Sequence, residues 1–117
     1  MNKRKVGDYY ETKAIEYLEN QGLKIVDKNY RNRFGEIDII AMDDSYLVFI
    51  EVKYRRTASA GHPEEAVNYH KALKISRVAD YYRVARKVPL DKSCRFDVVA
   101  IEANEIRWYK NAFNYVC

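Results

Sequence analysis

The chain has 117 residues, of which 48% are hydrophobic and 32% are charged, a composition that fits one globular domain and excludes a largely disordered chain. The formal net charge of +4 is too small an excess to identify a polyanionic partner by itself. No apolar run approaches the ~20 residues that a membrane-spanning helix needs, so we expect no membrane span.

The N-terminal residues predict a helix rather than a secretory signal. The basic start at residues 3–5 is followed by polar residues and not by an apolar stretch, so we expect a cytoplasmic protein. Apolar residues at helical spacing predict a first helix over about residues 7–20, which Gln21 and Gly22 would end. The residues of this apolar stripe are Tyr10, Ala14, Tyr17 and Leu18.

Three strands are expected next. Residues 23–30 alternate loosely between apolar and polar side chains, and a basic turn over residues 31–35 follows. Residues 36–41 and 46–53 are rich in β-branched and aromatic side chains. Because only a short polar segment with Asp43, Asp44 and Ser45 separates them, these two segments predict a β-hairpin.

The second half of the chain predicts one helix and two strands. A proline and two glutamates at residues 63–65 predict the start of a long helix that ends before Pro89. Residues 95–101 and 105–109 predict two further strands. The order α-β-β-β-α-β-β over residues 1–117 therefore predicts a single α/β domain with a mixed sheet flanked by helices. The apolar face of the second helix would contain Ala72, Ile75, Ala79 and Tyr82.

Two acids and a lysine occupy positions in the predicted hairpin where apolar residues are usual. Side chains alternate along a strand, so Glu51 and Lys53 point to the same face. If Asp44 and Ser45 form a two-residue turn, Asp38 lies directly opposite Glu51. This register predicts that two carboxylates and an ammonium group converge at one end of the sheet.

The expected closeness of the two carboxylates points to a metal ion. Two ionised carboxylates repel one another, and a divalent cation removes the conflict. Oxygen ligands favour Mg²⁺, Mn²⁺ or Ca²⁺ over zinc. We therefore predict that Asp38 and Glu51 bind Mg²⁺ (or Mn²⁺) and that Lys53 stabilises charge on an attacked phosphate. The spacing alone also fits a surface salt bridge, which is worth ~0–1 kcal/mol.

Two further acids lie within apolar segments. Glu11 sits on or beside the apolar stripe of the first helix, where an acid needs either a partner or a path to solvent. Both outcomes remain open for Glu11. Asp97 lies between Phe96 and Val98, and we expect it to be a structural hydrogen-bond acceptor.

Motifs along nearly the whole chain resemble those of one known family. The chain resembles the small uncharacterised bacterial proteins called YraN-like, which are placed in the PD-(D/E)XK nuclease superfamily near the archaeal Holliday junction resolvases. The signature proline before the motif Asp is absent, and Ile37 takes its place. The resemblance implies a restriction-endonuclease-like (PD-(D/E)XK) fold, a central mixed sheet flanked by α-helices. The motifs that carry it include Gly35-Glu36-Ile37-Asp38 and Glu51-Val52-Lys53, in this order and spacing.

The same resemblance implies a site and an activity. Asp38 and Glu51 would bind the metal together with the backbone carbonyl of Val52, and Lys53 would be the catalytic lysine. Glu11 would match the acid that the first helix contributes in the resolvase-like branch. The implied activity is Mg²⁺-dependent endonucleolytic hydrolysis of DNA, with branched or structured DNA among the substrates. Because resolvase relatives act as dimers, a homodimer is also expected.

Basic and aromatic residues suggest the surface that meets a nucleic acid. Two alternative functions remain open, namely a nucleic-acid-binding module without catalysis and a protein-interaction domain. The eleven tyrosines fit either stacking on nucleobases or ordinary packing. The residues predicted to contact phosphates flank the acids in sequence or lie on the second helix, and they are Arg31, Arg33, Arg55, Arg56 and Lys71.

Overall fold

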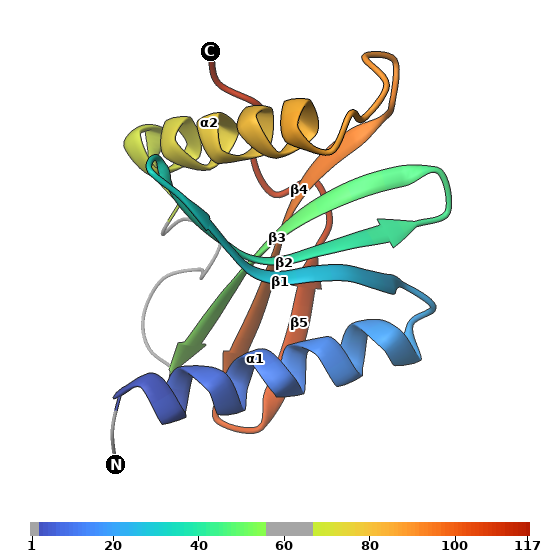
Figure 1. The fold of residues 1–117 in the computed structure, drawn as a ribbon. Coiled ribbons are helices and arrows are strands. Elements are labelled where there is room, and N and C mark those ends of the chain that lie inside the picture. The colour runs from blue at the N-terminus through green and yellow to red at the C-terminus, as the bar shows by residue number, and fades with distance from the viewer. Residues whose placement is uncertain (1–2, 56–66) are drawn as a thin grey trace.

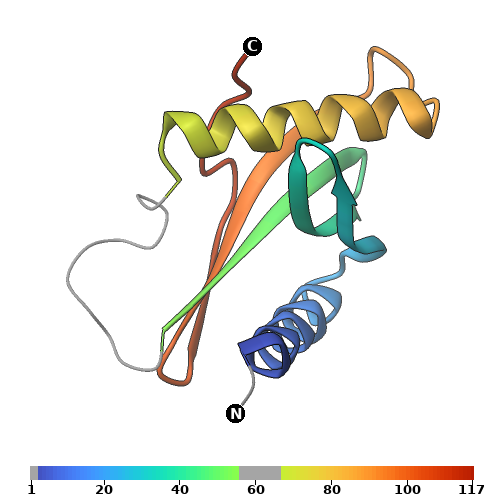
Figure 2. The same ribbon diagram turned by 60° about the vertical axis from the view of Figure 1, so that its left-hand side comes forward.

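The computed structural model describes residues 3–55 and 67–117 of the chain. Within these residues, five strands form one sheet, with one helix packed on each face (Figure 1). Figure 2 shows the two helices on opposite sides of the strands. The predicted element order and the mixed α/β architecture are therefore confirmed. Neither described helix has the length and apolar character that crossing a membrane requires.

Helix α1 runs over Lys3–Asn20 and so begins a turn before the predicted start at residue 7. Its Ala14 and Leu18 are fully buried, as the apolar spacing predicted. The helix ends where Leu23 donates its backbone N–H to the carbonyl of Leu18, at 3.0 Å. Gly22 has a φ of +98°, a conformation that glycine adopts without steric cost.

Strands β1 (Lys24–Asn32) and β2 (Gly35–Asp43) form an antiparallel hairpin. Arg31 and Asn32 belong to β1, so the predicted five-residue turn is shorter than expected. Asn29 lies between Lys28 and Tyr30, which pair with Ile39 and Ile37, and it has a φ of +51°, a conformation that asparagine tolerates better than most residues. The register between β1 and β2 shifts earlier in β1, between Ile25 and Asp27.

Strand β3 (Tyr46–Arg55) continues from β2 through the predicted two-residue turn, because Asp43 pairs with Tyr46. The predicted register is confirmed as far as the pair Ile39 and Ile50. Beyond that pair the ladder between β2 and β3 stops. Asp38 and Glu51 thus lie where the two strands separate.

Helix α2 covers Tyr69–Ala85, and Asn68 caps it by accepting a hydrogen bond from the backbone N–H of Lys71 at 3.0 Å. The proline and glutamates predicted to start this helix, at 63–65, lie outside the described residues. The helix ends before Pro89, as predicted. Its buried residues include the predicted apolar face and are Ala72, Ile75, Ser76, Val78, Ala79 and Tyr82.

The last two strands complete the mixed sheet. Strand β4 (Cys94–Glu102) pairs parallel with β3, and β5 (Glu105–Tyr109) pairs antiparallel with β4. The strand order is β1-β2-β3-β4-β5, so β3 is the central strand. A parallel neighbour requires a crossover connection, which contains α2.

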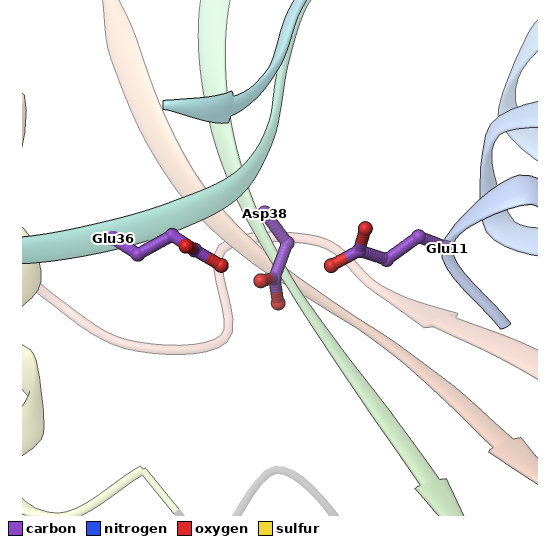
Figure 3. Close-up of side chains that lie close together, drawn as sticks. All are labelled: Glu11, Glu36 and Asp38. Carbon is purple, nitrogen blue, oxygen red and sulfur yellow. The ribbon is translucent and has the colours of Figure 1, made fainter. Parts of the chain in front are cut away.

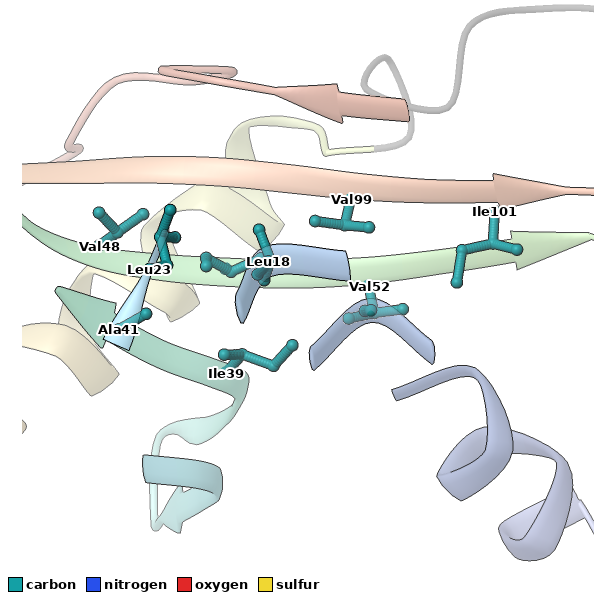
Figure 4. Close-up of a cluster of buried hydrophobic side chains, with 10 residues drawn as sticks. Leu18, Leu23, Ile39, Ala41, Val48, Val52, Val99 and Ile101 are labelled. Carbon is teal, nitrogen blue, oxygen red and sulfur yellow. The ribbon is translucent and has the colours of Figure 1, made fainter. Parts of the chain in front are cut away.

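Two hydrophobic cores lie on the two faces of the sheet. The core on the α1 side joins Leu18 to sheet residues such as Val48 and Val99 (Figure 4). The core on the α2 side contains Ile37, whereas Ile39, two residues later, belongs to the α1-side core. Residues two apart on a regular strand point to the same face of the sheet. Because Ile37 and Ile39 point to opposite faces, the regular alternation of β2 is interrupted at Asp38. Burial of a large aliphatic side chain contributes ~1.5–3 kcal/mol. The burial of Ile37 in one core and of Ile39 in the other therefore holds β2 in place on both sides of Asp38.

Candidate functional site

The candidate site lies where β2 and β3 separate. Because the strand ladder has ended there, the backbone N–H of Val52 is free to bond a side chain, and it donates to Asp38 Oδ2 at 2.8 Å. At this point each strand contributes one acid, Asp38 from β2 and Glu51 from β3. In Figure 1 both helices begin on the side of the molecule where β3 ends, so the positive ends of their dipoles lie on that side.

Glu51 is the buried acid of this site. Its side chain faces the α2 side of the sheet and is only 7% exposed. Lys71 Nζ lies 3.6 Å from Glu51 Oε2, whereas Glu51 Oε1 has no hydrogen-bond partner among the described residues. Burial, followed by the charge of Asp38, raises the pKa of Glu51 to about 7, although Lys71 and Lys53 oppose the rise. A buried carboxylate oxygen without a partner is costly unless a ligand supplies one.

Asp38 shares this environment. Burial raises the pKa of Asp38, and the hydrogen bond from Val52 opposes that rise. The repulsion between Asp38 and Glu51 means that the two carboxyl groups resist being ionised together. All side-chain donors here are carboxylate oxygens, the ligand type that Mg²⁺ and Mn²⁺ prefer. The residues present, including the orphaned oxygen of Glu51, therefore fit a hard divalent cation.

Two lysines face the two carboxylates. Lys53 is half-buried on β3, and burial together with the neighbouring Lys71 lowers its pKa. Lys71 comes from the first turn of α2 and forms an ion pair with Glu51. The sequence suggested Lys71 only as a phosphate contact, but the structure also brings it to the acid pair. The site thus combines charges from the sheet and from α2.

A second acidic group adjoins Asp38 from the α1 side. Carboxylate oxygens of Glu11, Glu36 and Asp38 all lie within 4.8 Å of one another (Figure 3). Glu11 extends from α1 toward Asp38, so the structure brings together these two predicted residues. Sequence reasoning did not select Glu36. Its position two residues before Asp38 on one strand was the signal that could have identified it.

Glu11 has the partners that its place beside the apolar stripe requires. Burial, followed by the charge of Asp38, raises the pKa of Glu11 to about 7. A side-chain hydrogen bond with Asn29 opposes this rise. Asn29 of β1 therefore supplies a contact to the α1 acid.

The predicted phosphate-contacting arginines lie at the edges of the site. Arg31 Nε donates to Glu36 Oε2 at 2.9 Å, so this arginine is already paired with one acid of the group. The guanidinium carbon of Arg33 lies 4.9 Å from the ring centre of Phe34 at the hairpin turn. Arg55 ends β3 and is half-buried. Arg56 lies outside the described residues.

Asp97 is a buried acid outside this site. It is fully buried on β4 and accepts hydrogen bonds from Arg95 Nε at 2.9 Å and from Trp108 Nε1 at 2.9 Å. The backbone N–H of Asn111 donates to the same carboxylate at 2.8 Å. These bonds join β4 to β5 and to the segment after it, and they confirm the structural role predicted for Asp97.

Comparisons with known proteins place these residues in a family context. The family model described as "Uncharacterised protein family UPF0102" matches residues 10–101, a range that includes every predicted site residue. A UPF0102 protein of Lachnoclostridium phytofermentans is 48% identical over 97% of this chain and 97% of its own length. A relative with the same name in Fusobacterium nucleatum is 44% identical over 95% of this chain and 92% of its own length.

A third relative shows that the similarity extends to other bacterial groups. A UPF0102 protein of Persephonella marina is 43% identical over 89% of each chain. These names state neither a substrate nor a reaction. The function must therefore be inferred from the chemistry of the site.

Proposed function

The chain belongs to UPF0102, the YraN-like bacterial family that its motifs resemble, and we propose that it is a divalent-metal-dependent endonuclease acting on DNA. In this proposal, the mixed sheet and its two helices form a restriction-endonuclease-like (PD-(D/E)XK) domain. Cleavage takes place in the cytoplasm, and branched or structured DNA is among the substrates.

One observation carries the proposal. Glu51 is buried beside Asp38, and its Oε1 has no hydrogen-bond partner within the described chain. A purely structural acid would have both oxygens satisfied. A divalent cation shared with Asp38 would satisfy the orphaned oxygen and relieve the repulsion between the two carboxylates. The two lysines beside these carboxylates carry positive charge that would attract the negatively charged phosphodiester.

The metal would be held by residues of β2 and β3. Asp38 and Glu51 would supply carboxylate oxygens, and the backbone carbonyl of Val52 is the proposed additional ligand. The hydrogen bond from Val52 N–H already fixes one oxygen of Asp38 and so orients its carboxylate. Mg²⁺ or Mn²⁺ in this position would polarise a phosphoryl oxygen and favour formation of hydroxide from water.

The remaining residues would position the reactants. Lys53, a half-buried ammonium group, would stabilise negative charge that builds on the attacked phosphate. Glu11 would orient the attacking water and accept its proton, because a pKa of about 7 suits a general base near neutral pH. Lys71 would balance the charge of Glu51 before DNA arrives and then meet a phosphate.

The basic residues around the acids would hold the DNA backbone. Arg33 at the hairpin turn and Arg55 and Arg56 after β3 would contact phosphates on either side of the cleaved bond. Arg31, which is already hydrogen-bonded to Glu36, would also contact a phosphate. A homodimer would place two such sites on one branched substrate.

The test combines metal binding with cleavage. Mg²⁺, Mn²⁺ and Ca²⁺ are titrated calorimetrically into the wild type, Glu51→Gln and the control Glu19→Gln, with and without an uncleavable phosphorothioate DNA. Cleavage of labelled branched, nicked and single-stranded DNA is then measured for the same proteins. We expect Glu51→Gln to lose metal binding and at least about 100-fold in rate, whereas Glu19→Gln, an exposed position at the far end of α1, keeps both.

Two outcomes would overturn the proposal. One is wild-type protein that binds no divalent cation even with DNA present. The other is cleavage that Glu51→Gln leaves unchanged, since a contaminating nuclease would give that result. DNA binding that survives in protein without any metal-dependent cleavage would instead identify a non-catalytic nucleic-acid-binding module.

A further inference from the structure

Three tyrosines form a partly exposed aromatic cluster beside the acidic site. The rings of Tyr10 on α1 and Tyr54 on β3 are stacked, with centroids 4.3 Å apart and planes 12° from parallel. Tyr9 meets the edge of Tyr10 at 5.2 Å. Tyr9 is 56% exposed and Tyr54 is 40% exposed, so the two outer members of the cluster present aromatic surface to solvent.

These exposures are much greater than that of a tyrosine packed in the core of the same fold. Tyr82 also belongs to an aromatic group, where Tyr30 and Phe49 meet it edge to face. Tyr82 is only 3% exposed and fills the α2-side core. Other surface tyrosines such as Tyr69 and Tyr81 are similarly exposed, so what distinguishes Tyr9 and Tyr54 is that their rings gather with Tyr10 in one cluster.

A pocket of about 320 Å³ adjoins this cluster. Lys13, one of its residues, places its ammonium group 5.5 Å from the centre of the Tyr9 ring. The pocket thus combines aromatic and aliphatic walls, an amide and a cation, the groups that hold a flat heterocycle attached to a phosphate chain. Its lining includes Tyr9, Tyr10 and Lys13 of α1 and Ile101, Asn104 and Ile106 of the β4–β5 hairpin.

The cluster and the acids are connected through the backbone. Tyr10 precedes Glu11 on α1, and Tyr54 follows Lys53 on β3. Consecutive Cα atoms lie about 3.8 Å apart, so both elements carry a tyrosine and a charged site residue as direct neighbours. Alternation along β3 sends Lys53 toward α2 and Tyr54 toward α1. A nucleotide chain that crosses the end of β3 would meet the charged groups and then the tyrosines.

We propose that Tyr9, Tyr10 and Tyr54, with the pocket beside them, bind an unpaired nucleobase of single-stranded nucleic acid. The base stacks on the exposed tyrosine rings, and Lys13 contacts a phosphate of the same strand. This inference rests on the proposed function for the position of the neighbouring phosphate. It adds a substrate class to that function, namely DNA that contains an unpaired segment next to the cleaved bond.

Base binding is tested without cleavage. Fluorescence anisotropy in EDTA compares a labelled oligothymidylate with a strand of equal length that has abasic sites in place of the bases. Tyr9→Ala and Tyr54→Ala are the test variants, because both side chains are exposed and their loss leaves the cores intact. Tyr54→Phe keeps the ring, and Tyr81→Ala removes a tyrosine of α2 that is 49% exposed and lies outside the cluster.

We expect Tyr9→Ala and Tyr54→Ala each to weaken oligothymidylate binding by about fivefold or more, the effect of losing one base-stacking ring. Tyr54→Phe and Tyr81→Ala should bind within about twofold of the wild type. The abasic strand should bind more weakly than oligothymidylate and should not respond to the tyrosine variants.

The inference is overturned if the abasic strand binds the wild type as tightly as oligothymidylate, if both alanine variants bind normally, or if neither strand binds. The outcome is separate from that of the proposed function. Base-dependent binding by a protein that cleaves no DNA would support this inference while overturning the endonuclease proposal. Metal-dependent cleavage by a protein without base-dependent binding would support the endonuclease proposal and overturn this inference.

Discussion

Two buried acids on the neighbouring parallel strands β3 and β4 differ in how their oxygens are satisfied. Asp97 on β4 is fully buried and holds Arg95, Trp108 and the backbone of Asn111 through hydrogen bonds of 2.8–2.9 Å. Glu51 on β3 is almost as buried, yet among the described residues it forms an ion pair with Lys71 at 3.6 Å and one of its oxygens has no hydrogen-bond partner.

This difference separates an acid that stabilises the fold from an acid that is suited to chemistry. Burial costs both carboxylates their water, but only Asp97 recovers the lost hydrogen bonds within the chain. Glu51 is left with a raised pKa and an unsatisfied oxygen. Such a group lowers the stability of the metal-free protein and gains most from a ligand. Three changes test this contrast, from the largest expected effect to the smallest.

The largest effect is expected from Asp97→Ala. The substitution leaves the guanidinium of Arg95, which is 12% exposed, without its main partner and removes the acceptor of Trp108. Breaking one side of a buried ion pair costs about 3–5 kcal/mol in the free energy of unfolding, which urea denaturation measures. Asp43→Ala removes the other carboxylate that contacts Arg95 and is the matched control. An equal loss in both variants would show that Asp97 has no special role.

A smaller effect of opposite sign is expected from Glu51→Gln. An unfolded glutamate titrates near pH 4.3, whereas burial raises the pKa of Glu51 to about 7 in the fold. Between these values the folded state binds more protons, so the contribution of Glu51 to stability is fully present below the unfolded pKa and is lost as pH rises through about 7. Glutamine stays neutral, and the metal-free variant should therefore be about 1–3 kcal/mol more stable than the wild type at pH 8.

The measurement is the free energy of unfolding in EDTA at pH 5 and pH 8. The wild type should lose more stability between these values than Glu51→Gln does, and Glu19→Gln should follow the wild type. If Glu51→Gln were less stable than the wild type at pH 8, Glu51 would be a structural acid like Asp97, and the contrast between the two would fail.

The smallest effect is expected from Arg31→Ala. This arginine pairs with Glu36, but its side chain is 72% exposed, so water screens the pair and its contribution is about 0–1 kcal/mol. We expect the thermal midpoint to shift by only a few degrees, whereas affinity for DNA should fall at low salt and converge with that of the wild type at high salt. A large stability loss would indicate that Arg31 supports the acids structurally.

The sequence predicted those parts of the fold and site that follow from local rules. The two-residue turn sets the pairing of β2 with β3, so the meeting of Asp38 with Glu51 could be predicted from alternation and residue numbers alone. The positive φ of Asn29 could not be predicted in this way, because neither strand alternation nor the turn sets it. Glu36 was missed because its neighbour Asp38 already accounted for the expected ligand.

The contacts from the helices were harder to predict than those within the hairpin. Helical spacing placed Glu11 beside the apolar stripe but left open whether it would reach Asp38 or water. The approach of Lys71 to Glu51 depends on where α2 begins, and Asn68 sets that start several residues after the expected proline. Such contacts depend on the angle and register of packed helices, which single-sequence patterns do not fix.

The separation of β2 from β3 also has a consequence for the order of folding. Asp38 and Glu51 meet through a hairpin, which closes in ~1–10 μs, whereas the parallel pairing of β3 with β4 must wait for the crossover that contains α2. During synthesis the hairpin leaves the ribosome before Lys71 does, because Lys71 follows it in the chain. The nascent chain therefore brings the two carboxylates together with Lys53 beside them but before Lys71 is available, and we expect free divalent cations to favour the hairpin at that stage.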